Sequence, residues 1–159
     1  MKNYHVPFYG KFVSTESVSL PKGYFISENK KEIADKLLQH GIIVEQLTES
    51  VELKVTSFQV EKIENSQRMY QGHLTTKISG IYKSGERKIK AGTYFVGMDQ
   101  PLADLAAYLL EPESDGGLVY WNFFDRYLRV SQWSRSLNEF PVLRLMQPKY
   151  FARKCVEKF

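Results

Sequence analysis

A long alternation of apolar and polar side chains, from Val51 to Ile63, constrains this chain more than any other feature of its sequence. The apolar positions are odd-numbered at Val51, Leu53 and Val55 and even-numbered at Phe58 and Val60. A two-residue period is typical of a β-strand with one face on a core. A bulge near Thr56–Ser57 would keep both sets on the same core, so the alternation predicts a fold built around a sheet.

Other segments carry the same strand signal. The segments 74–82 and 89–96 flank Lys83–Arg87, a polar stretch containing a glycine that is typical of a hairpin turn. The remaining predicted strands are 18–26, 42–47 and a last short one at 141–143.

A first helix is predicted at 30–40. Asn29 and Glu32 have the spacing of a capping box, and Gly41 is a typical C-terminal stop. Strand, helix and strand then follow one another within 24–47, which is compatible with a crossover that places two parallel strands side by side.

A second helix is predicted at 101–111, because apolar residues recur there at helical spacing. Asp99 or Gln100 can cap it, and Pro112 ends it. The segment 118–128 is apolar almost throughout, so its periodicity does not separate a buried helix from a strand.

These signals predict a single α+β domain with a mostly antiparallel or mixed sheet and two to three helices. A β-sandwich with peripheral helices is the alternative. The chain has 159 residues, enough for one ordinary core. We expect the domain to span 1–159, with an ordered core at about 6–146 and a basic C-terminal tail at 147–159.

Composition narrows the classes of partner. The net charge of +4 comes from 22 basic and 18 acidic residues whose signs alternate along the main body, so no nucleic-acid partner is expected. Cys155 is the only cysteine, which excludes an intrachain disulfide and a cysteine metal cluster. No apolar run approaches the ~20 residues that span a bilayer, so no membrane span is expected.

Three acids, Glu111, Glu113 and Asp115, directly precede a run of aromatic residues. They match a calcium loop poorly, since Asn122 takes the place of its bidentate glutamate. Paired carboxylates could hydrolyse glycosides, but the sequence does not set the separation that this needs. Because acids just after an apolar helix are usually solvated, we predict no catalytic and no metal-binding residue in this chain.

The histidines do not form a zinc site in the sequence. His5, His40 and His73 lie in different elements, and none begins the His-x-x-Glu pair of a zinc hydrolase. His73, beside Gly72 at a strand start, could be a surface hydrogen-bonding residue.

Aromatic residues in 120–127 allow two interpretations. Core filling is the simpler one. In the other, Trp121 and its neighbours form an exposed platform for a protein or a sugar, with Glu111 or Asp125 as polar partners.

One long stretch also resembles a known family. The sequence GTYFVGMDQPLADLAAYLLEPESDGGLVYWNFFDRYL at 92–128 resembles the domain that follows the catalytic domain in bacterial zinc carboxypeptidase-like proteins, especially those of Bacteroidetes. One departure from the family pattern is Gly116, where a second acid is expected after Asp115. The supporting pieces are VPFYGKF at 6–12, LPKGYFIS at 20–27, LLQHGIIVEQL at 37–47 and QGH at 71–73.

The resemblance implies a non-catalytic C-terminal accessory domain of a metallocarboxypeptidase-like parent, which is itself exported. It implies no cofactor in this chain, with zinc held only in a separate catalytic domain. The implied partners are that catalytic domain and a peptide or glycan. A carbohydrate-binding module is the alternative, and an independent hydrolase is a third hypothesis. The candidate interface or ligand-binding residues are Glu111, Glu113, Asp115, Trp121, Asn122, Asp125, Arg126 and His73.

Overall fold

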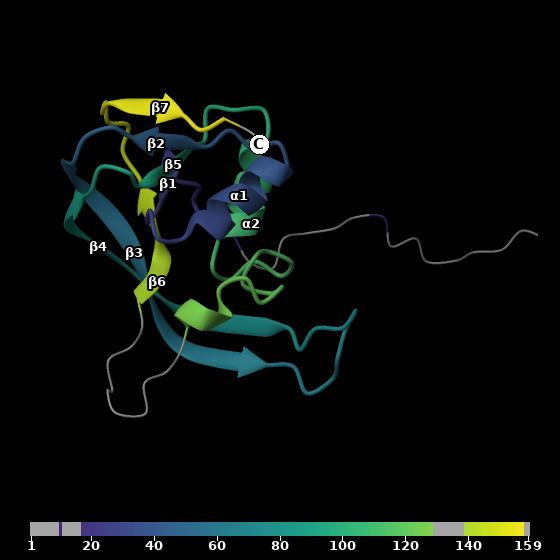
Figure 1. The fold of residues 1–159 in the computed structure, drawn as a ribbon. Coiled ribbons are helices and arrows are strands. Elements are labelled where there is room, and N and C mark those ends of the chain that lie inside the picture. The colour runs from purple at the N-terminus through teal and green to yellow at the C-terminus, as the bar shows by residue number, and fades with distance from the viewer. Residues whose placement is uncertain (1–9, 11–16, 129–138, 158–159) are drawn as a thin grey trace, which may run out of the picture.

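The computed structural model describes residues 10, 17–128 and 139–157. Seven described strands form one sheet, and two helices lie together on one of its faces (Figure 1). No helix in this part of the chain is long and apolar enough to cross a membrane. In chain order the elements are β1 (Gly23–Ile26), α1 (Lys31–Gln39), β2 (Glu45–Leu47), β3 (Val51–Asn65), β4 (Thr76–Ile89), β5 (Tyr94–Gly97), α2 (Ala103–Leu110), the 3-10 turn η1 (Asp125–Tyr127), β6 (Glu139–Leu145) and β7 (Arg153–Cys155).

The strands lie in the order β4-β3-β6-β1-β5-β2-β7, and every described pair is antiparallel. The prediction of a mostly antiparallel sheet with two helices is confirmed. The two-sheet sandwich is not seen among these strands. The prediction that β1 and β2 lie side by side is wrong, because β5 runs between them and pairs antiparallel with both.

The sheet curls because its connections are short. Four strand spacings of ~4.8 Å would place β2 and β3 about 19 Å apart in a flat sheet. The connection from Leu47 to Val51 can reach only about 14 Å at ~3.5 Å per residue. The sheet therefore bends until the two strands come within reach of the loop at 48–50.

The curled sheet buries side chains on both faces. Tyr24 and Ile26 of β1 belong to the larger core cluster, which includes the buried sides of α1 and α2. Phe25, between them, belongs to a smaller cluster that also contains Phe151. The core thus extends beyond the expected end near 146, because Phe151 is buried and β7 pairs with β2.

The change of phase in β3 divides its side chains between the two clusters. Val55 faces the smaller cluster and Phe58 the larger, so the prediction of one shared core is wrong. Towards β4 the pairing is regular through Thr56–Ser57, and its irregularity comes later, at Glu61. Towards β6 the pairing is irregular beside Pro141, which has no N–H to donate.

The predicted hairpin turn at Lys83–Arg87 is also wrong. These residues continue β4, where Gly85 lies opposite Val55 of β3. The loop between β3 and β4 lies instead at 66–75. Polar and charged side chains suit this stretch because β4 is an edge strand exposed to water.

The C-terminal stop of α1 agrees with the prediction, whereas the N-terminal caps of both helices do not. Gly41 (φ 86°) ends α1, where the N–H groups of Gly41 and Ile42 donate to the Leu38 and Leu37 carbonyls, a Schellman motif. At the N-terminal ends, Lys30 and Leu102 are the capping residues and neither makes a side-chain capping bond, so the predicted caps are wrong.

The ambiguous segment 118–128 is neither a long helix nor a strand. It consists of turns and η1, and it buries Leu118, Val119, Phe124 and Leu128 in the larger cluster. His5 and most of the resemblance segment 6–12 lie outside the described residues.

Candidate functional site

The loop between β3 and β4 contains a tight turn that displays aromatic side chains. Tyr70 and His73 exchange two backbone hydrogen bonds of 2.8 and 2.9 Å around Gln71 and Gly72. Both central residues have positive φ, 49° and 84°, as in a type I′ turn. Such a turn fixes the two flanking side chains relative to each other.

Trp121 packs against this turn from the segment after α2. Its ring centroid lies 5.4 Å from that of His73 and 6.1 Å from that of Tyr70. Tyr70 is 53% exposed, and its neighbours Met69 and Leu74 are 69% and 50% exposed. We call Met69, Tyr70, His73, Leu74 and Trp121 the hairpin-tip face.

Asn122 joins the hairpin-tip face to the domain. Its Oδ1 accepts a 3.2 Å hydrogen bond, so His73 donates from Nδ1. Its Nδ2 lies 2.9–3.0 Å from three acceptors, on Leu74, Thr76 and Asp125, and its two hydrogens are shared among them. The residue has φ 69°, a left-handed conformation that asparagine tolerates better than most residues. Asn122 therefore fixes the segment after α2 against the loop at 66–75.

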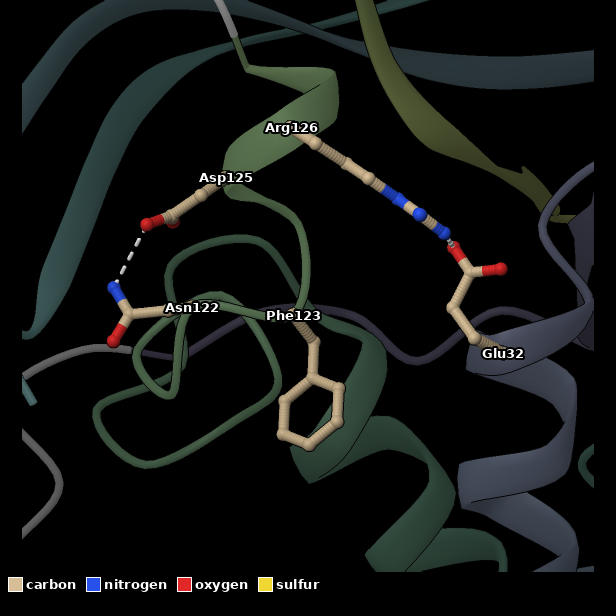
Figure 2. A pocket seen from close by; sticks show the side chains of 5 residues that line it. All are labelled: Glu32, Asn122, Phe123, Asp125 and Arg126. Atoms are coloured by element: carbon tan, nitrogen blue, oxygen red, sulfur yellow. Dashed lines mark hydrogen bonds and ion pairs between the residues drawn. The ribbon is translucent and has the colours of Figure 1, made fainter.

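An open pocket of about 580 Å³ lies beside this network (Figure 2), lined by Glu32, Asn122, Phe123, Asp125 and Arg126. Arg126 and Glu32 form an ion pair across the pocket. Tyr127 donates a hydrogen bond to the same glutamate. Burial raises the pKa of Glu32, but the hydrogen bonds from Arg126 and Tyr127 outweigh it and hold the pKa below its usual value.

Glu111 lies in a separate, buried cluster. Tyr24 and Tyr82 each donate a 2.6 Å hydrogen bond to its carboxylate. Arg144 lies 3.4 Å from the carboxylate through Nε, too poorly aligned for a hydrogen bond, and its Nη2 donates to the Ser19 carbonyl. Burial and the neighbouring carboxylate raise the pKa of both tyrosines far above the ordinary value near 10. Glu111 thus binds the end of α2 to the sheet.

The three acids of the predicted cluster have different partners. Glu111 is buried, whereas the Glu113 carboxylate accepts a 3.4 Å hydrogen bond from the Gly80 N–H of the edge strand. Asp115 interacts with the Tyr108 hydroxyl, and burial together with this carboxylate raises the pKa of that tyrosine. Within the described ranges, no three His, Cys, Asp or Glu side chains gather as a metal site would require.

The structure therefore brings together His73, Trp121, Asn122, Asp125 and Arg126 from the predicted set, and separates the three acids from them. Tyr70, Thr76 and Glu32 also belong to the site and were not predicted from the sequence. The Gln71-Gly72 pair was a usable signal for the turn, since glycine favours its left-handed position. Arg144 was not predicted either, because no local pattern marks a buried partner for Glu111.

Comparisons with family models, curated proteins and solved structures gave no significant match. The resemblance to zinc carboxypeptidase-like proteins stays a prediction.

Proposed function

We propose that this chain is a non-catalytic accessory domain that docks on a partner protein domain through the hairpin-tip face. One observation carries the proposal: exposed apolar side chains are held in place by a tight turn and by the Asn122 network. Exposed apolar groups on a rigid support favour binding, because little conformational entropy is lost when a partner covers them.

The partner that we propose is a zinc carboxypeptidase-like catalytic domain of the same parent protein. The support is the sequence resemblance at 92–128, which contains Trp121 and Asn122 of the site. In this proposal the partner domain binds the zinc. The domain described here positions that catalytic domain or presents a peptide to it.

Calorimetric titration of this chain with the peptidase-like domain of its parent reading frame tests the proposal. We expect micromolar affinity, as for transient interfaces between domains. A double variant, Tyr70→Ser with Leu74→Ser, should weaken binding at least about tenfold, one lost contact of about 1.4 kcal/mol. Tyr150→Ser, at a residue 93% exposed outside the hairpin-tip face, is the control. A parent frame without such a domain, or equal binding by all variants, overturns the proposal.

A carbohydrate-binding module is the second candidate, favoured by the aromatic rings around Trp121. The Tyr120 ring lies 5.4 Å from it, in addition to His73 and Tyr70. Phe124, by contrast, is fully buried and offers no stacking surface. Titration with chitotriose and cellotriose, followed by tryptophan fluorescence, should show a change that Trp121→Ala removes. An unchanged spectrum at about 10 mM sugar, a Kd range of weak binding, counts against this candidate.

A further inference from the structure

The pocket of Figure 2 is lined by residues that do not belong to the hairpin-tip face. It lies between the first turn of α1, which carries Glu32, and the segment containing Phe123 and Arg126. Its lining thus combines an aromatic ring with charges of both signs.

The charges of both signs are paired with each other across the pocket. The side chains of Glu32 and Arg126 are 39% and 57% exposed. An ion pair this accessible contributes only about 0–1 kcal/mol, so opening it costs little. A ligand of one charge would gain one of these partners and leave the other unpaired. A ligand carrying both charges would satisfy both partners at once.

The other groups at the pocket are compatible with a ligand that carries both charges. Asp125 accepts hydrogen bonds from Thr76 and Asn122, whereas Glu32 is the carboxylate that pairs with Arg126. Glu32 is therefore the carboxylate whose cationic partner a ligand can replace, and it keeps its hydrogen bond from Tyr127. The Lys36 ammonium lies 5.2 Å from the Phe123 ring centroid and adds a cation at the aromatic wall.

We propose that this pocket binds a small zwitterion with an apolar side chain, a free amino acid or a short peptide. The ligand's ammonium group replaces Arg126 on Glu32. Its carboxylate pairs with Arg126, and its side chain packs on Phe123. The volume of about 580 Å³ exceeds that of one amino acid and leaves room for a dipeptide.

Amide NMR titrations of the full chain test this assignment, with alanyl-phenylalanine, phenylalanine, N-acetylphenylalanine and phenylalaninamide as probes. We expect the zwitterions to shift the amide signals of Glu32 and Phe123 at millimolar concentrations. The two singly charged probes should bind up to about fivefold more weakly, because each loses one accessible pair of at most about 1 kcal/mol. Whether the dipeptide or the free amino acid binds more tightly identifies the natural length. Equal binding of charged and blocked probes, or no shift at 10 mM zwitterion, overturns the proposal.

Arg126→Gln and Glu32→Gln should each weaken dipeptide binding up to about fivefold, the loss of one accessible pair. Arg87→Gln is a matched control, because Arg87 is 53% exposed and pairs with a glutamate, Glu139, that is 39% exposed elsewhere on the sheet. Equal loss in the control contradicts a specific pocket. The Tyr70→Ser, Leu74→Ser double variant should keep dipeptide binding, so failure of this proposal and failure of domain docking are distinguishable.

Discussion

Glu111 and Arg144 form a 3.4 Å ion pair between side chains that are 8% and 5% exposed, joining the end of α2 to β6. An ion pair removed from water has a large desolvation cost, and it is retained only where further hydrogen bonds complete it. Tyr24 and Tyr82 supply them here. This relationship gives the acidic segment a structural role.

Glu111→Gln should lower the free energy of unfolding by about 3–5 kcal/mol, because it leaves a buried guanidinium without its counter-charge. Urea denaturation measures the loss. Glu139→Gln, which breaks the half-exposed pair with Arg87, is the control and should cost at most about 1 kcal/mol. Similar losses in the two variants would contradict the structural role of Glu111.

Alkaline pH should destabilise the domain through Tyr24 and Tyr82. The folded pKa of each is raised above the unfolded value near 10. Their contribution is therefore complete below pH 10, and it falls as rising pH deprotonates the unfolded chain first. Thermal unfolding between pH 8 and 11 should show this loss. Replacing both tyrosines by phenylalanine should flatten the decrease, whereas Tyr150→Phe should leave it unchanged.

Gly72→Ala should destabilise the domain by about 1–2 kcal/mol, because alanine is strained at a left-handed φ. An added Cβ has open space at Gly72 (φ 84°) and at Gly85, whose φ is not positive. Gly85→Ala is therefore the matched control and should cost nothing. Denaturation midpoints of the two variants measure the difference, and equal midpoints would rule out backbone strain.

Asn122→Ala should be more destabilising than Asn122→Gly by about 1 kcal/mol, although both remove the amide. Glycine tolerates φ 69°, so the difference isolates the backbone. Both variants should also loosen His73, which loses its acceptor. NMR relaxation of the loop at 66–75 measures that motion, and unchanged order would show that the amide does not fix the face.

The sequence predicted the elements better than their connections. The β3 alternation, the α2 stripe and the Gly41 stop are local patterns, and each was found. The turn at Lys83–Arg87 was wrong because a polar, glycine-containing stretch is equally suitable for an exposed edge strand. The site was found in part, since the acids that drew attention are separated by the fold.

The sequence by itself determined a mostly antiparallel sheet with two helices, because side-chain periodicity and helix-stop residues act within a few positions of the chain. Only the tertiary structure decided which side of the sheet each residue of β3 faces, and which acid is buried. Those outcomes depend on long-range partners, such as Arg144 for Glu111 and His73 for Asn122. Contacts between distant residues form only when the curled sheet brings them together, and no local pattern encodes them.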